Sequence, residues 1–242
     1  MFQYDDIKIN YELNGDKKKD ALVFLPGWGQ NIEMIEPIAK PFYDTNAVLI
    51  IDLPGFGKSE EPKKVWELND YVEMIHSLAI DLGLKNISLI GHSFGGKLSL
   101  MYALKYKVKR LVLLASPYKK KIKKDSMKTK ILKKLKKVPV LSGVANVAKN
   151  FIGSTDYKNA TPMMRDILVK HVNTDISKDV TKIKCPTLII WGTEDSDVPY
   201  EDAQELESLI KDSGLVTYEG CTHYAYLERL NQTISVLKSF LG

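Results

Sequence analysis

The chain has 242 residues, of which 44% are hydrophobic and 27% are charged, and its formal net charge is +5. This composition is ordinary for one globular domain, and it excludes a chain that is disordered throughout, a collagen-like repeat and a disulfide scaffold. The longest purely apolar runs, such as Ala47–Ile51, are far shorter than the roughly 20 residues of a membrane span. We expect no transmembrane segment. Because the first residues do not resemble a signal peptide and only two cysteines occur, we expect a cytoplasmic protein.

The positive charge is concentrated in one segment. Between Lys119 and Lys137 there are eleven lysines and one aspartate, which sum to +10, so the remainder of the chain is mildly acidic. Such a segment fits a solvated helix face, an acidic protein partner or an anionic lipid surface. Nucleic acid is not expected, because the segment has no arginine and no aromatic residue to stack on bases.

The first half of the chain alternates short apolar segments with helical patterns. We expect strands at residues 7–13, 21–25, 47–51, 87–90 and 109–115, and helices at 34–43, at 71–82 and from 94 onward. Asn69 is a suitable N-cap for the helix over 71–82, and Gly83 follows its end. Continuously apolar strands separated by helices are typical of a parallel sheet that is covered on both faces.

The alternation stops near Ser116 and resumes at about residue 183. In between, the sequence predicts only helices, at 127–138, 144–151 and 163–172; strands at 186–191 and 215–218 and helices at 200–211 and 231–241 follow. We therefore predict an α/β core formed by residues 1–116 and 183–242. Residues 117–182 are predicted to form a helical cap inserted between two parts of one sheet.

The most specific motif is Gly91-His92-Ser93-Phe94-Gly95, a G-x-S-x-G pattern between a predicted strand and a predicted helix. In this context the serine occupies a tight turn that projects its hydroxyl from the sheet, and the helix directs N–H groups toward the site. The alternative is a glycine-rich turn with an N-capping serine. We predict that Ser93 is a nucleophile.

A serine nucleophile needs a histidine base. Four histidines occur in the chain. His92 adjoins Ser93 in the sequence, which is poor geometry for a base, and His76 and His171 fall within predicted helices. His223 follows the last predicted strand, so we expect it at the same sheet edge as Ser93 and predict that it is the base.

The base needs a carboxylate that orients it, and this acid is expected in the loop after the strand at 186–191. Asp195 is the favoured residue and Asp197 is its rival, although either carboxylate could instead cap the helix that follows. The resulting order along the chain is serine, aspartate, histidine, which differs from the order in other triad folds.

The tetrahedral intermediate of acyl transfer needs two hydrogen-bond donors for its oxyanion. One donor is expected to be the backbone N–H of Phe94, which follows the nucleophile. The other is expected from Trp28, in the loop after the strand at 21–25, because Pro26 has no N–H. We also expect Trp28 and Phe94 to contact the substrate, with packing in the core as the alternative for the indole. No metal ion and no organic cofactor is expected.

Four blocks of this sequence, in order, resemble the α/β-hydrolase superfamily over nearly the whole chain. They are residues 25–29, 52–59, 91–96, and 191–199 together with 223–229. The resemblance implies an α/β-hydrolase fold, with a mostly parallel sheet of about eight strands, helices on both faces and a helical cap. One departure is that the oxyanion loop begins Pro26-Gly27, whereas His-Gly is usual in the superfamily, so the hydrogen bonds that brace this loop are left open.

Within the superfamily, the Pro-Gly-Trp-Gly and Gly-His-Ser-Phe-Gly-Gly sequences and the short cap are most similar to the carboxylesterase of biotin synthesis, which cleaves the methyl ester of pimeloyl-acyl-carrier protein. This resemblance implies hydrolysis of a carboxylic ester through an acyl-enzyme. It also implies an acidic acyl-carrier protein as partner of the basic segment between Lys119 and Lys137. Three alternatives stay open: cleavage of carbon–carbon bonds as in meta-cleavage hydrolases, for which Arg165 is the only arginine in the predicted cap; perhydrolase chemistry; and a non-catalytic receptor or binding protein.

Overall fold

The computed structural model describes residues 1–120 and 155–242. The helices expected at 127–138 and 144–151 and most of the basic segment between Lys119 and Lys137 lie outside the described residues. The structural role of that segment therefore stays a prediction.

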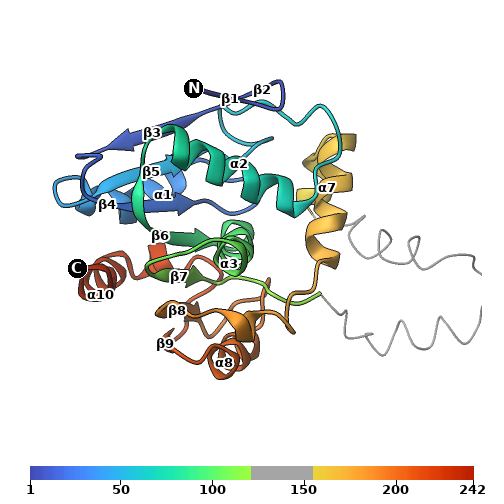
Figure 1. The fold of residues 1–242 in the computed structure, drawn as a ribbon. Coiled ribbons are helices and arrows are strands. Elements are labelled where there is room, and N and C mark those ends of the chain that lie inside the picture. The colour runs from blue at the N-terminus through green and yellow to red at the C-terminus, as the bar shows by residue number, and fades with distance from the viewer. Residues whose placement is uncertain (121–154) are drawn as a thin grey trace, which may run out of the picture.

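A seven-stranded sheet forms the centre of the described structure, and its strand order is β3-β5-β4-β6-β7-β8-β9 (Figure 1). Its strands are β3 (Tyr11–Asn14), β4 (Asp20–Leu25), β5 (Ala47–Ile51), β6 (Lys85–His92), β7 (Leu111–Leu114), β8 (Thr187–Gly192) and β9 (Ser213–Tyr218). The edge strand β3 is antiparallel to β5, and all other neighbouring strands are parallel. The predicted mostly parallel α/β sheet is confirmed, with seven strands in the described chain where about eight were expected.

The strand expected over residues 7–13 is divided between two sheets. Strand β2 (Ile7–Ile9) pairs with β1 (Phe2–Tyr4) in a separate two-stranded sheet, and β3 joins the central sheet. The division falls at Asn10, whose side chain donates to Asp52 Oδ2 at 2.8 Å and whose N–H donates to the Ser59 hydroxyl at 2.8 Å. These contacts with another segment interrupt the strand, so only its second half joins the central sheet.

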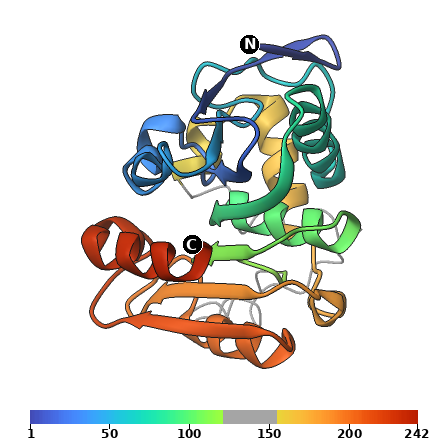
Figure 2. The same ribbon diagram turned by 60° about the vertical axis from the view of Figure 1, so that its left-hand side comes forward.

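Helices cover both faces of the sheet. They are α1 (Ile32–Ala39), α2 (Leu68–Asp81), α3 (Phe94–Lys105), α6 (Thr155–Asn159), α7 (Pro162–Asn173), α8 (Tyr200–Leu209), α9 (Ala225–Glu228) and α10 (Leu230–Leu241), with 3-10 turns η1 (Lys40–Phe42) and η2 (Val180–Lys182). Successive side chains of a strand point to opposite faces. Leu89 of β6 accordingly packs in the apolar cluster with α2, α3 and α8, whereas Ile90 packs in the cluster with α1 and α10. Figure 2 shows the strands stacked between these helices.

The boundaries of two helices differ from the expected ones. Helix α2 begins at Leu68, and its N-cap is Glu67 rather than Asn69, because the Glu67 side chain accepts from the Asp70 N–H while the Asp70 carboxylate accepts from the Glu67 N–H at 2.7 Å. The helix expected at 34–43 is α1, which ends at Ala39 and continues as the 3-10 turn η1. Asn69 thus lies inside the first turn of its helix.

In the described part of the segment between β7 and β8, the regular elements are α6, α7 and the 3-10 turn η2, and irregular stretches connect them. Helix α7 stands beside α2 (Figure 1), and its Met164 side chain packs so closely on Gly55 that a Cβ at Gly55 would lie 2.5 Å from it. The division into a core of 1–116 and 183–242 and a cap of 117–182 stays a prediction. Among the described residues, no helix is long and apolar enough to cross a membrane.

Candidate active site

Ser93 occupies a strained turn between β6 and α3. Its φ is 50° and its ψ is −112°. Residues other than glycine rarely adopt a positive φ of this kind. Small neighbours permit this turn, since a Cβ at Gly91 would lie 2.4 Å from the Gly95 oxygen and a Cβ at Gly95 would lie 2.1 Å from the Leu25 oxygen. The turn is held in place because the Ser93 N–H donates to the Leu114 oxygen at 2.9 Å.

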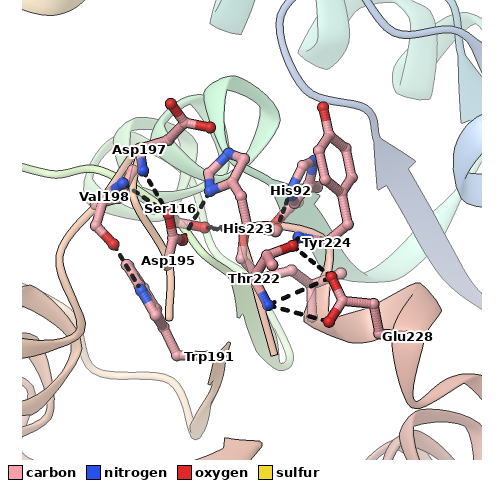
Figure 3. A network of polar contacts seen from close by, with 12 residues as sticks. His92, Ser116, Trp191, Asp195, Asp197, Val198, Thr222, His223, Tyr224 and Glu228 are labelled. Carbon is pink, nitrogen blue, oxygen red and sulfur yellow. Dashed lines mark hydrogen bonds and ion pairs between the residues drawn. The ribbon is translucent and has the colours of Figure 1, made fainter. Parts of the chain in front are cut away.

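Asp195 and His223 meet in loops at the carboxyl ends of β8 and β9 (Figure 3). His223 Nδ1 donates to Asp195 Oδ2 over 2.7 Å, and both residues are 8% exposed. The second carboxylate oxygen, Oδ1, accepts from the N–H groups of Asp197 and Val198 at 2.8 and 2.9 Å. Both oxygens of Asp195 are therefore occupied, and His223 carries its proton on Nδ1, which leaves Nε2 as an acceptor.

Asp197 lies in the same loop but has a different environment. The residue is exposed, and its backbone N–H, rather than its carboxylate, takes part in the network. The ligand-bearing atoms of Asp195, Asp197 and His223 lie within 4.8 Å of one another. The Asp195–His223 hydrogen bond already uses two of these atoms, so the donor set fits an ordered histidine–carboxylate pair better than a metal centre.

The loop that carries His223 is fixed on both sides. Before it, the Thr222 N–H and hydroxyl both donate to the Glu228 carboxylate of α9. Beneath it, Gly192 is packed against the chain, because a Cβ there would lie 2.1 Å from the Cys221 oxygen. The His223 carbonyl oxygen lies 3.0 Å from Nε2 of His92, which precedes Ser93 (Figure 3). The elbow of Ser93 and the loop of His223 are thus in direct contact.

The structure brings Trp28 and Phe94 together beside Ser93. Their ring centroids are 5.3 Å apart in an edge-to-face arrangement. Neither backbone N–H donates to another described residue: Phe94 is the first residue of α3, where no acceptor exists within the helix, and Trp28 lies in the loop between β4 and α1. Two N–H donors without a described acceptor are therefore present, one on the residue after Ser93 and one in the loop whose indole contacts Phe94.

Sequence reasoning missed the role of His171 in this arrangement. The imidazole lies on α7, is 6% exposed, stacks over Trp28 with a ring distance of 6.1 Å and meets the edge of Phe94 at 4.6 Å. Its position depends on Lys97 of α3, whose Nζ donates to the oxygens of His171 and Thr174 at 2.9 and 2.8 Å. Burial lowers the pKa of Lys97 to about 8. No local pattern in the sequence distinguishes this buried lysine from the many exposed ones.

Comparison with known proteins agrees with the fold. A family model described as alpha/beta hydrolase fold matches residues 20–135, and a second, described as TAP-like protein, matches residues 167–241. This is an α/β-hydrolase fold. Both matches, together with the relatives and solved structures below, support a place for the chain in the α/β-hydrolase superfamily, and they do not single out the esterase group of biotin synthesis.

Among curated relatives of this chain, AB hydrolase superfamily protein YisY of Bacillus subtilis (strain 168) is 27% identical, with 90% of each chain covered. A 2-hydroxy-6-oxononadienedioate/2-hydroxy-6-oxononatrienedioate hydrolase of Escherichia coli (strain K12) is 26% identical over 89% of this chain and 82% of its own. A similar solved structure is an esterase from Exiguobacterium antarcticum, with a TM-score of 0.76, 21% identity and coverage of 97% and 95% of the two chains. Another is the meta-cleavage product hydrolase from Pseudomonas fluorescens IP01, with a TM-score of 0.74, 18% identity and coverage of 98% and 94%.

Proposed function

We propose that this chain is a serine hydrolase that cleaves carboxylic esters through an acyl-enzyme. The observation that carries the proposal is the buried hydrogen bond between Asp195 and His223, in a loop that contacts the strained turn of Ser93. A histidine held with its proton on Nδ1 offers Nε2 as a base, which is what a serine hydroxyl requires at neutral pH.

In the proposed reaction the Ser93 hydroxyl attacks the ester carbonyl carbon, and His223 Nε2 accepts the hydroxyl proton. The resulting imidazolium, stabilised by Asp195, returns this proton to the departing alkoxide, which leaves as the alcohol. A water molecule then gives a proton to His223 and attacks the acyl carbon, so that the carboxylic acid leaves and Ser93 is restored. No step requires a metal or an organic cofactor.

The negative charge that develops on the carbonyl oxygen is assigned to two donors. The proposal gives this role to the N–H groups of Phe94 and Trp28, and its support is that neither group has another acceptor among the described residues. Removing one donor of this kind typically costs about 10²- to 10³-fold in kcat. The side chains of Trp28, Phe94 and His171 form an aromatic cluster at this place, which suits an apolar acyl chain.

Carbon–carbon bond cleavage is the second candidate, because curated relatives carry the name of such hydrolases. The substrate in those printed names is a dioate, so a chain with that activity needs cationic groups for carboxylates. Arg165 does not offer its guanidinium freely: it donates to the oxygens of Tyr157 and Lys158 at 2.8 and 3.0 Å and lies over the Tyr157 ring. Among the described residues, this arginine is therefore a poor partner for a substrate carboxylate.

An acidic acyl-carrier protein as a partner is proposed from the sequence alone. Lys119, the first residue of the basic segment, forms ion pairs with Asp202 and Glu205 of α8, at 2.9 and 2.5 Å. This lysine is therefore engaged by the protein itself, and a carrier protein would have to use the lysines that follow.

The test compares hydrolysis of p-nitrophenyl esters from acetate to palmitate by the wild type and by Ser93→Ala, with a 2-hydroxy-6-oxo-dienedioate assayed in parallel. The proposal expects ester turnover that Ser93→Ala lowers at least a thousand-fold, as is typical for loss of a nucleophile. Faster turnover of the dienedioate would favour the second candidate. Labelling of Ser93 by a fluorophosphonate without turnover of either substrate would favour a receptor or binding protein.

A further inference from the structure

We infer that Gln30 and His92 form a brace that positions the oxyanion loop and the loop of the base around Ser93. This inference rests on the proposed function, since it concerns residues that would act through the groups assigned there. It assigns a positioning role to two buried polar residues that do not touch the substrate in the proposed reaction. We call this pair the Gln30–His92 brace.

The first half of the brace holds the oxyanion loop. The Gly27 N–H donates to Gln30 Oε1 at 2.8 Å, and the Gln30 N–H donates back to the Gly27 oxygen at 3.2 Å. Gln30 is 8% exposed. The loop begins Pro26-Gly27 and lacks the histidine that is usual at its start, so the Gln30 side chain supplies the hydrogen bond that fixes the residue before Trp28.

The second half connects this loop to the base. His92 Nδ1 lies 3.0 Å from Gln30 Oε1, and His92 Nε2 lies 3.0 Å from the carbonyl oxygen of His223. The His92 ring also packs against the rings of His223 and Tyr226, with centroids 4.8 Å away in both cases. One imidazole therefore joins two loops that are almost two hundred residues apart in the chain, and its own backbone adjoins Ser93.

His92 is suited to holding rather than to transferring protons. Its side chain is completely buried, and burial, with a smaller contribution from His223, lowers its pKa to about 3. The ring is therefore neutral at working pH and carries one proton, which it can donate to Gln30 or to the His223 oxygen. The ring thus donates one hydrogen bond at a time, and packing holds its other nitrogen beside the second oxygen.

The space around the brace is tight. A Cβ at Gly27 would lie 2.9 Å from His92 Nδ1 and 3.0 Å from Gln30 Oε1. The loop, the Gln30 amide and the His92 imidazole are therefore in close van der Waals contact. Acyl transfer depends on the mutual placement of the nucleophile, the base and the oxyanion donors, and a misplacement of about 1 Å can cost about 10²-fold in rate. Loss of the brace is therefore expected to lower kcat more than it changes KM.

The test uses Gln30→Met, which keeps the length of the side chain and removes its acceptor, and Gln30→Glu, which restores an acceptor oxygen. His92→Phe removes both ring nitrogens, and the matched control is His76→Phe on α2, where the histidine contacts Tyr102 and Tyr106 instead. We expect Gln30→Met and His92→Phe each to lower kcat about 10- to 100-fold with KM within about threefold of the wild type. We expect Gln30→Glu to recover most of that loss and His76→Phe to keep the wild-type kcat.

The double variant Gln30→Met with His92→Phe distinguishes a brace from two separate packing effects. Residues that act as one unit are non-additive, so we expect the double variant to be no slower than the slower single variant by more than about threefold. Unchanged kcat in Gln30→Met, a multiplicative loss in the double variant, or no recovery in Gln30→Glu overturns the inference. If His92→Phe does not fold, Gln30→Met and Gln30→Glu decide alone.

Ser93→Ala in the same assay distinguishes a failure of the proposed function from a failure of the Gln30–His92 brace. If Ser93→Ala retains activity, the proposed function is wrong, whatever the brace variants do. If Ser93→Ala is inactive while Gln30→Met and His92→Phe have the kcat of the wild type, only the brace is wrong.

Discussion

Replacing Asp195 with asparagine tests the orientation of the proposed base, and the structure indicates which way the new amide would face. The oxygen Oδ1 of Asp195 accepts two backbone N–H groups, from Asp197 and Val198, at 2.8 and 2.9 Å. An asparagine must keep its oxygen there, because its NH₂ group would otherwise face two donors and leave both unpaired, at about 1–3 kcal/mol each. The NH₂ group therefore points at His223 Nδ1.

An amide N–H facing Nδ1 forces the neutral imidazole of His223 to carry its proton on Nε2. In that tautomer Nε2 cannot accept the proton of Ser93. The corresponding substitution in a serine protease lowers kcat about 10⁴-fold with the geometry intact, and such a loss corresponds to about 5.4 kcal/mol of transition-state stabilisation. We therefore expect Asp195→Asn to lose about four orders of magnitude in kcat with little change in fold.

The assay is the steady-state rate on the best p-nitrophenyl ester at pH 7.5, with the thermal midpoint measured for each variant. The matched control is Asp197→Asn, because Asp197 is exposed and contributes only its backbone N–H to the network. We expect this variant to stay within about threefold of the wild type, as is usual for surface substitutions. A larger loss in Asp197→Asn than in Asp195→Asn, or more than a tenth of wild-type kcat in Asp195→Asn, would show that Asp195 is not the acid that orients His223.

Three further predictions concern stability. Ser93→Gly should abolish activity yet raise the free energy of unfolding by about 1 kcal/mol relative to Ser93→Ala, because glycine adopts the φ of 50° without strain. Equal urea midpoints for the two variants would contradict this prediction. Burial lowers the pKa of Lys97 from 10.5 to about 8, so between these pH values the unfolded chain binds more protons than the folded one, and the free energy of unfolding rises with pH. Relative to Lys97→Met, the wild type should gain up to about 3 kcal/mol between pH 7.5 and pH 10.5 in urea titrations; a constant difference would show that the lysine is not shifted. Gly95→Ala should lower the free energy of unfolding by about 3 kcal/mol, since its Cβ would lie 2.1 Å from the Leu25 oxygen. The control Gly214→Ala, whose Cβ would have nothing within 4 Å, should change it by less than about 1 kcal/mol. Similar losses in both variants would point to a general effect of removing glycine.

The sequence by itself determined the features that depend on neighbouring residues. Apolar runs such as Ala47–Ile51 predicted buried parallel strands, and the Gly-x-Ser-x-Gly pattern located the turn of Ser93, because the contact between Gly91 and Gly95 is made within five residues. Gly83 follows the end of α2 with a φ of 70°, as its position predicted. These signals are local, so they could be read without knowing the fold.

The tertiary structure decided the features in which distant segments meet. The sequence favoured Asp195 and left Asp197 as its rival, and only the folded loop turns the first toward His223 and the second toward solvent. Gln30 and His92 gave no separate signal, because their partners lie in other loops and become neighbours only when the strands align. Hydrogen bonds and burial depend on distance in space, and a pattern along the chain does not specify which remote backbone oxygen a buried side chain will meet.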